Sequence, residues 1–112
     1  MADASIMTAL MKVIADRKAD LEQPSYVARL IKGGAASICS KIIEEAAEVV
    51  EASEEPGDAG REHLVKEVAD LVFHTAVLLG YRDLDWGDVE AELTRRFGTS
   101  GLVEKAARKP KS

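Results

Sequence analysis

Cysteine, proline and aromatic residues are scarce in this chain of 112 residues. Its single cysteine, Cys39, cannot form a disulfide within the chain, which fits a reducing cytosol. We expect Cys39 to be a small buried residue. Three prolines, eight glycines and 4% aromatic residues, with 46% hydrophobic and 31% charged residues, are typical of a helical globular protein rather than a disordered or fibrous one.

Long hydrophobic runs and an excess of positive charge are also missing. The longest uncharged run, residues 71–81, is too short to span a bilayer, and the amino terminus lacks a signal-peptide pattern. We therefore expect a cytoplasmic protein. The net charge of −5 argues against a general nucleic-acid or membrane binder. It is compatible with an anionic small substrate if a metal cation and local Lys or Arg residues reverse the field.

Helical periodicity accounts for most of the chain, and no segment of useful length alternates with a period of two. The expected helices cover residues 5–19, 25–32, 36–54, 60–79 and 86–97. The expected N-caps and stops are Ser25, Asp85, Gly33-Gly34, Pro56-Gly57 and Gly80. The predicted fold is all-α, built around an antiparallel hairpin of the third and fourth helices. Because a chain this short buries only a thin core, we expect a homodimer to complete it.

Acidic residues follow the apolar side of the third expected helix. At 100° per residue, its apolar arc holds Ile38, Cys39, Ile42, Ile43, Ala46, Val49 and Val50. Glu45 falls at the edge of this arc, and Glu48, three residues later, lies on the same side. Taken alone, this pattern favours a solvated margin rich in Glu and Lys.

The fourth expected helix places two acids where burial is expected. Its apolar residues cover nearly the whole circumference, which is typical of a buried helix: Leu64, Val68, Leu71, Val72, Phe73, Val77, Leu78 and Leu79. Glu67 and Asp70 lie among them in angle, and burying an unpaired carboxylate is costly. Only Lys41 and Lys66 are near enough in the sequence to pair with these acids.

A divalent cation would resolve this conflict, because two facing helices can each supply a pair of carboxylates. All-oxygen ligation predicts Mg²⁺, with Mn²⁺ as the alternative. A di-iron bundle would need Glu-x-x-His on two helices, whereas the pairs here are Glu45-x-x-Glu48 and Glu67-x-x-Asp70. His74 could be a ligand or support one, but a hydrogen-bonded core histidine is the favoured interpretation. His63 carries no such argument.

These acids form part of a recognisable pattern. Glu44-Glu45-x-x-Glu48 followed by Glu67-x-x-Asp70 resembles the paired acidic motif of the MazG-like all-α nucleotide pyrophosphatases. Further blocks resemble the phosphoribosyl-ATP pyrophosphatases of histidine biosynthesis: Ser25-Tyr-Val-Ala-Arg-Leu30 with Gly33, Ala69-Asp-Leu-Val-Phe-His74, and Arg95-Arg-Phe-Gly-Thr-Ser-Gly-Leu102 with Glu104-Lys-Ala106. The resemblance covers residues 25–106 as a pyrophosphatase domain. Residues 1–24 are then an N-terminal helix and connector, and residues 107–112 a basic tail expected to fray.

The resemblance implies Mg²⁺-dependent hydrolysis of 1-(5-phospho-β-D-ribosyl)-ATP to the AMP derivative and pyrophosphate, the second step of histidine biosynthesis. An acidic pocket can bind a polyanionic triphosphate through bridging Mg²⁺. The family motif and the helical-face argument assign the metal ligands as Glu45, Glu48, Glu67 and Asp70. Glu44 is the candidate for positioning or deprotonating the attacking water, although an exposed acid or an additional ligand is nearly as good an interpretation.

Basic residues in and around the same blocks are candidates for holding phosphate. Lys41 lies one turn before Glu45 on the same side of its helix. Arg29 could reach the extra phosphoribosyl group. A second candidate cradle combines guanidinium, hydroxyl and backbone donors from Arg95, Arg96, Thr99, Ser100 and Gly101.

Two other functions remain open at this stage. The same fold and metal could serve a house-cleaning pyrophosphatase that acts on non-canonical or deoxynucleoside triphosphates, although the flanking blocks argue against it. Alternatively, the chain could be a non-enzymatic helical dimerisation module whose acids are merely solvated. That alternative predicts no stabilisation by Mg²⁺.

Overall fold

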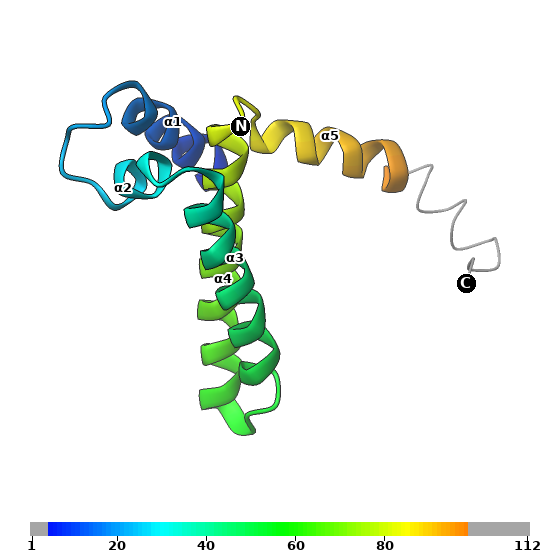
Figure 1. Ribbon diagram of the computed structural model, residues 1–112. Coiled ribbons are helices and arrows are strands. Elements are labelled where there is room, and N and C mark those ends of the chain that lie inside the picture. The colour runs from blue at the N-terminus through cyan, green and yellow to red at the C-terminus, as the bar shows by residue number, and fades with distance from the viewer. Residues whose placement is uncertain (1–4, 99–112) are drawn as a thin grey trace.

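Five α-helices make up the part of the chain that the structure describes, residues 5–98 (Figure 1). This computed structural model contains no strand within that range, which confirms the all-α prediction. The helices are α1 (Ile6–Ala19), α2 (Tyr26–Lys32), α3 (Gly34–Ala52), α4 (Gly57–Tyr81) and α5 (Trp86–Phe97).

Both expected N-caps are confirmed. The Ser25 hydroxyl accepts a hydrogen bond from the Ala28 N–H at 3.2 Å and thereby satisfies one of the free donors at the start of α2. Asp85 caps α5 in a reciprocal arrangement with Asp88, whose carboxylate accepts from the Asp85 N–H at 2.8 Å. These local signals explain why α5 has the bounds that the sequence predicts.

The glycines near the hairpin act differently from the prediction. Gly34 and Gly57 begin α3 and α4, each with a positive φ (79° and 74°), so these helices start earlier than residues 36 and 60. Gly80 does not end α4 but lies within it. A Cβ at Gly80 would stand 2.4 Å from Cγ2 of Ile14, so the glycine allows α1 and α4 to approach closely.

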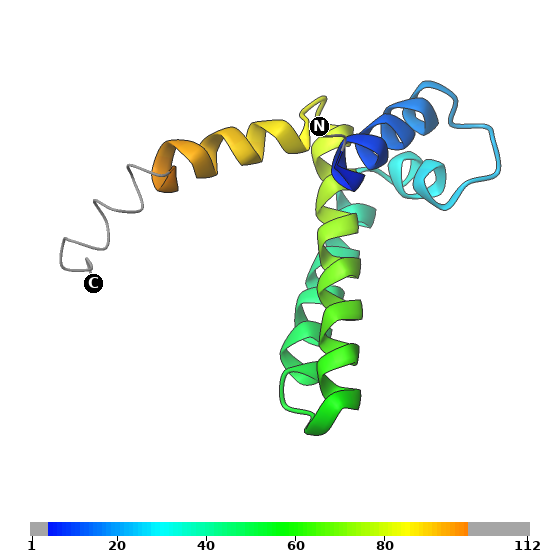
Figure 2. The same cartoon turned by 180° about the vertical axis from the view of Figure 1, so that it is seen from behind.

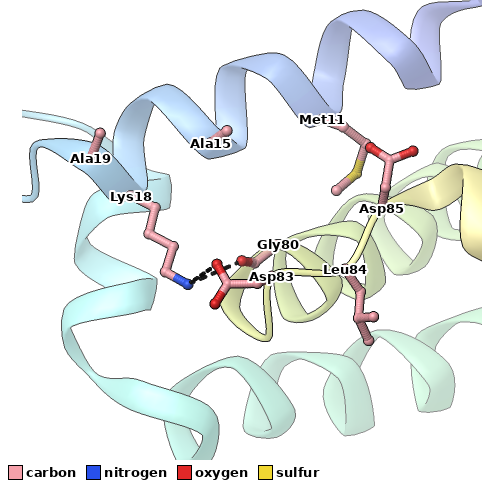
Figure 3. A pocket seen from close by; sticks show the side chains of 8 residues that line it. All are labelled: Met11, Ala15, Lys18, Ala19, Gly80, Asp83, Leu84 and Asp85. Carbon is pink, nitrogen blue, oxygen red and sulfur yellow. Dashed lines mark hydrogen bonds and ion pairs between the residues drawn. The ribbon is translucent and has the colours of Figure 1, made fainter.

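The hairpin of α3 and α4 forms a long antiparallel arm, and α1 and α2 pack at the end where α3 begins and α4 ends (Figures 1 and 2). The buried core gathers at this end and comprises Met11, Ile14, Val27, Leu30, Ile31, Ile38, Ala76 and Val77. Lys18 links α1 to the end of α4, because its Nζ donates to the Tyr81 carbonyl at 2.9 Å. The same Nζ lies 2.7 Å from Oδ1 of Asp83 (Figure 3). A basic group satisfies the last carbonyls of α4 there.

The rest of the hairpin is not covered by its own chain, so the expectation that α4 is buried all round is wrong. Val65 is 69% exposed and Val68 41% exposed on α4. Ile43 (71%) and Val50 (61%) leave part of the α3 arc open as well. The apolar pattern indicates faces that are suited to burial. It does not indicate whether the same chain or another molecule covers them.

Helix α5 leaves the bundle and projects to one side of the hairpin (Figures 1 and 2). It contacts mainly α1, and none of its residues is buried. None of the helices in residues 5–98 combines the length and apolar character needed to cross a membrane.

Candidate metal centre on the helical hairpin

Carboxylates from both arms of the hairpin converge midway along it. One oxygen from each of Glu45, Glu67 and Asp70 lies within 4.8 Å of the others. The three-residue spacing puts Glu67 and Asp70 on one side of α4, and the antiparallel packing of α3 brings Glu45 against them. Glu45 is buried, Glu67 half-buried and Asp70 exposed, so the cluster runs from the hairpin interior to the surface.

Glu48 adjoins this cluster, because its carboxyl group interacts with those of Glu67 and Glu45. Its hydrogen bond with Glu67, then burial, then the negative charge of Glu45 and Glu67 together raise the pKa of the Glu48 carboxyl to about 7. Crowding four carboxylates in this way calls for a positive charge among them.

Two buried oxygens in the cluster indicate which kind of positively charged group would fit the site. Oε1 of Glu45 and Oε1 of Glu67 have no hydrogen-bond partner among the described residues. A buried acceptor without a partner is costly, and a cation coordinated by these oxygens would remove that cost. The donor set consists of carboxylate oxygens, which suits a hard ion such as Mg²⁺ or Mn²⁺. The residues present therefore fit the predicted ion.

The expectation that Glu45 belongs to a solvated margin, which α3 suggests when taken alone, is wrong. Glu45 is only 6% exposed, because α4 packs over the edge of the apolar arc where it lies. Asp70 is expected on a buried helix, but it is exposed, because the face of α4 that carries it is open. The burial of each acid therefore depends on where α3 and α4 meet, and not only on its angular position around its own helix.

Lys41 and Glu44 lie next to the cluster on α3. Nζ of Lys41 is 3.2 Å from Oε2 of Glu44 and 3.9 Å from Oε2 of Glu45. The hydrogen bond to Glu44 is the main cause that raises the pKa of Lys41. Glu44 is exposed and engaged with Lys41, so its assignment as the group that handles water remains a prediction.

His63 contacts the cluster, although no sequence pattern indicates a role for it. Its Nε2 lies 3.0 Å from Oε2 of Glu67, and its Nδ1 lies 2.9 Å from Oε1 of Glu55 in the turn between α3 and α4. Spacing alone could have indicated the first contact, because Glu67 follows His63 by four residues on one helix. The second contact depends on the tertiary course of the turn.

His74 is a hydrogen-bonded core histidine, as the favoured interpretation predicts. Its Nδ1 donates to the backbone carbonyl of Asp70 at 2.8 Å, so a neutral ring presents Nε2 as the acceptor for the Tyr26 hydroxyl, also at 2.8 Å. His74 is buried, and its ring also meets the edge of Phe73. The guanidinium of Arg29 lies 5.7 Å from the centre of the Tyr26 ring, which links Arg29 through this chain of contacts to α4 at Asp70.

Within residues 5–98, Arg95 and Arg96 are not brought to the carboxylate cluster of their own chain. They lie near the outer end of α5, away from the hairpin (Figure 1), and both bind Glu92. Hydrogen bonds from Arg95 and Arg96 lower the pKa of Glu92 to about 2. The other members of the predicted cradle, Thr99, Ser100 and Gly101, lie outside the described residues.

A pocket of about 520 Å³ lies elsewhere, between α1 and the turn that follows α4 (Figure 3). Its lining includes Met11, Lys18, Asp83 and Leu84 and none of the predicted site residues. The carboxylate cluster, rather than this pocket, carries the chemistry that the sequence predicts.

Fold and cluster together define a class, that of all-α proteins in which carboxylates from both arms of a helical hairpin converge on one site. The sequence profile of the phosphoribosyl-ATP pyrophosphohydrolase family matches residues 7–97, which include α1 from its second residue onward. The chain belongs to this family and is therefore an enzyme, a pyrophosphatase of the hydrolase class. This sets aside the non-enzymatic alternative.

Curated relatives agree over nearly the whole chain. A phosphoribosyl-ATP pyrophosphatase of Rhodopirellula baltica is 48% identical over 91% of this chain and 85% of its own length. Proteins with the same name from Neisseria meningitidis serogroup B and Geobacter metallireducens are each 51% identical. The first match covers 93% of this chain and 94% of the relative, and the second covers 92% of each.

Proposed function

We propose that this enzyme hydrolyses phosphoribosyl-ATP to phosphoribosyl-AMP and pyrophosphate, using Mg²⁺ or Mn²⁺, as the second step of histidine biosynthesis in the cytoplasm. One observation carries the proposal: the acids of α3 and α4 converge and leave buried oxygens of Glu45 and Glu67 without partners. The names of the relatives supply the substrate.

Glu45, Glu48, Glu67 and Asp70 would hold the ion. Bound Mg²⁺ supplies positive charge that neutralises phosphate oxygens and lowers the pKa of water. In the hydrolysis, an oxygen–phosphorus bond to water forms and the bond bridging the α- and β-phosphates breaks, so that pyrophosphate leaves.

Lys41 and Glu44 would act as a pair. In the absence of substrate, Lys41 donates to Glu44. A phosphate oxygen competing for Lys41 would release the Glu44 carboxylate, which can then accept the proton of the attacking water. Arg29 on α2 would bind the phosphoribosyl group, because it is exposed while its guanidinium rests over the Tyr26 ring.

We further propose that the enzyme is a homodimer in which a second copy covers the open apolar faces of the hairpin. Ile43 and Val50 on α3, with Val65 and Val68 on α4, are large apolar residues with 41–71% exposure. Leu93 is 49% exposed on α5, which projects without a partner helix along most of its length (Figure 2). Apolar surface of this extent on a small protein is typical of an interface.

A product assay tests the proposed reaction. Purified enzyme is incubated with phosphoribosyl-ATP, with Mg²⁺ or with a chelator, and pyrophosphate and phosphoribosyl-AMP are quantified. We expect turnover only with the ion, and none in Glu67→Gln. Parallel assays with deoxynucleoside triphosphates decide the alternative: faster turnover of these would make the enzyme a house-cleaning pyrophosphatase, and no turnover of either substrate would overturn the proposal.

A further inference from the structure

His63 bridges two carboxylates, one inside the converging cluster and one outside it. On one side lies Glu67, a member of the converging cluster, and on the other lies Glu55, an exposed acid in the turn between α3 and α4. The two ring nitrogens are both engaged, at 2.9 Å to Glu55 and 3.0 Å to Glu67. His63 itself is half-buried beside the site.

The bridge needs two N–H donors, because ionised carboxylates only accept hydrogen bonds. A neutral imidazole has one N–H and would leave a bare nitrogen against one of the two acids. The imidazolium form satisfies both acids.

The two carboxylate oxygens of Glu67 differ in their contacts. Oε2 is bound to His63, whereas Oε1 is buried and has no hydrogen-bond partner among the described residues. A glutamate side chain has three rotatable bonds, and ordering it costs free energy that the ion would otherwise have to supply. A partner that already holds Oε2 reduces this cost.

We infer that His63, itself oriented by Glu55, is a positioning residue that holds Glu67 so that Oε1 is ready to bind the cation. This inference rests on the proposed metal site. Groups behind the ligands of a metal commonly set ligand orientation, and their loss typically weakens binding about 10–100-fold.

A purely electrostatic role for His63 makes the opposite prediction. A positive imidazolium next to the site repels a cation, so its removal would tighten binding if charge were all that mattered. Positioning predicts weaker binding in the same variant. The sign of the change therefore separates the two explanations.

The experiment measures the dissociation constant of Mn²⁺ from the paramagnetic resonance of the free ion, without substrate. His63→Ala removes both hydrogen bonds, whereas His63→Gln keeps an amide N–H that can donate to Glu67. Glu55→Gln removes the outer acid, and Glu54→Gln changes the adjacent exposed acid as its control. Circular dichroism confirms that each variant retains its helices.

We expect His63→Ala to weaken Mn²⁺ binding roughly 10-fold or more. His63→Gln should recover most of that loss, Glu55→Gln should weaken binding to a smaller extent, and Glu54→Gln should match the wild type. Equal or tighter binding in His63→Ala, or binding by His63→Gln as weak as by His63→Ala, would overturn the inference while leaving the metal site intact. Absence of Mn²⁺ binding by the wild type would overturn the metal site as well.

Discussion

Glu45 on α3 and Glu67 on α4 bring carboxylate oxygens within 4.8 Å of each other, and each keeps a buried Oε1 without a hydrogen-bond partner in residues 5–98. The folded hairpin thus holds like charges close together, and the proposed cation would offset their repulsion. Catalytic sites are often locally unfavourable in the unliganded protein, because the ligand supplies the missing charge.

The first prediction concerns Glu45→Gln, which keeps the shape of the side chain but removes its charge. Because repulsion among the acids decreases, we expect the metal-free protein to gain about 1 kcal/mol, or roughly 4–8 °C in Tm. The same variant should lose turnover and the rise in Tm that Mg²⁺ produces in the wild type. Thermal unfolding with and without Mg²⁺ measures both effects. A variant that keeps its response to Mg²⁺ would remove Glu45 from the set of ligands.

Glu48 and Asp70 differ from Glu45 because they are less buried, so their removal tests ligation with little effect on the core. We expect Glu48→Ala and Asp70→Ala each to abolish turnover of phosphoribosyl-ATP while helicity and assembly stay near normal. Initial rates and circular dichroism on the same preparations are the measurements. Wild-type rates in either variant would show that the ion is held elsewhere.

The response to Mg²⁺ should depend on pH. The pKa of Glu48 is raised from its ordinary value of 4.5 to about 7 in the folded metal-free protein. Its contribution to stability is therefore fully present below pH 4.5 and is lost as the pH rises through about 7.

Since the ion must displace this proton, the rise in Tm caused by Mg²⁺ should grow between about pH 6 and pH 8. Unfolding curves across this range, at constant ionic strength, measure the dependence. Glu48→Gln has no proton to displace and should flatten it. A Mg²⁺ effect that is equally large at pH 6 and pH 8 in the wild type would contradict the role assigned to Glu48.

Gly80→Ala tests the contact between α1 and α4. The new Cβ would stand 2.4 Å from Cγ2 of Ile14, which is fully buried, so we expect a loss of about 1–3 kcal/mol in the free energy of unfolding. Urea denaturation gives the value. In the background of Ile14→Ala, where Cγ2 is absent, the same substitution should cost much less. An equal cost in both backgrounds would place the strain elsewhere.

Dimerisation can be tested on the open face of α4. Val68→Glu introduces a charge on a face that we expect to be covered by a second copy, so the variant should sediment as a monomer while the wild type sediments as a dimer. Lys12→Glu, on an exposed position of α1, is the control and should stay dimeric. A monomeric wild type at micromolar concentration would overturn the proposed assembly.

Arg95 and Arg96 provide a test of whether the site is shared between chains. Both side chains bind Glu92 of their own helix, and α5 projects away from the hairpin (Figure 1), so a role in phosphate binding at the acidic cluster would require delivery to a second copy. Asp70→Ala and the double variant Arg95→Ala/Arg96→Ala should each be impaired alone. Mixed as exchanging dimers in equal amounts, they should recover about a quarter of the wild-type activity, because half of the dimers are mixed and each has one intact site. No recovery after confirmed exchange would exclude sharing.

Much of this enzyme follows from local rules. The side chains of Ser25 and Asp85 cap backbone N–H groups only two or three residues away, so the sequence predicts where α2 and α5 begin. The pairs Glu45-x-x-Glu48 and Glu67-x-x-Asp70 depend only on helical spacing, and their chemistry indicates a hard cation before any coordinates are known.

Other features depend on how the helices meet. Gly80 resembles a helix stop in the sequence, but it serves a close contact with Ile14 that lies far away along the chain. The burial of Glu45 and the exposure of Asp70 reverse the order that helical angles suggest. The contact of His63 with Glu55 requires the course of the turn between α3 and α4.

The sequence by itself therefore determined the helices, their caps and the identity of the acids, because each of these depends on neighbours within one or two turns. Only the tertiary structure decided how deeply each acid is buried, which of their oxygens lack partners and how far α5 with its arginines lies from the hairpin. The physical reason is that charge crowding and burial depend on distances between α3, α4 and α5, and no spacing along a single helix encodes those distances.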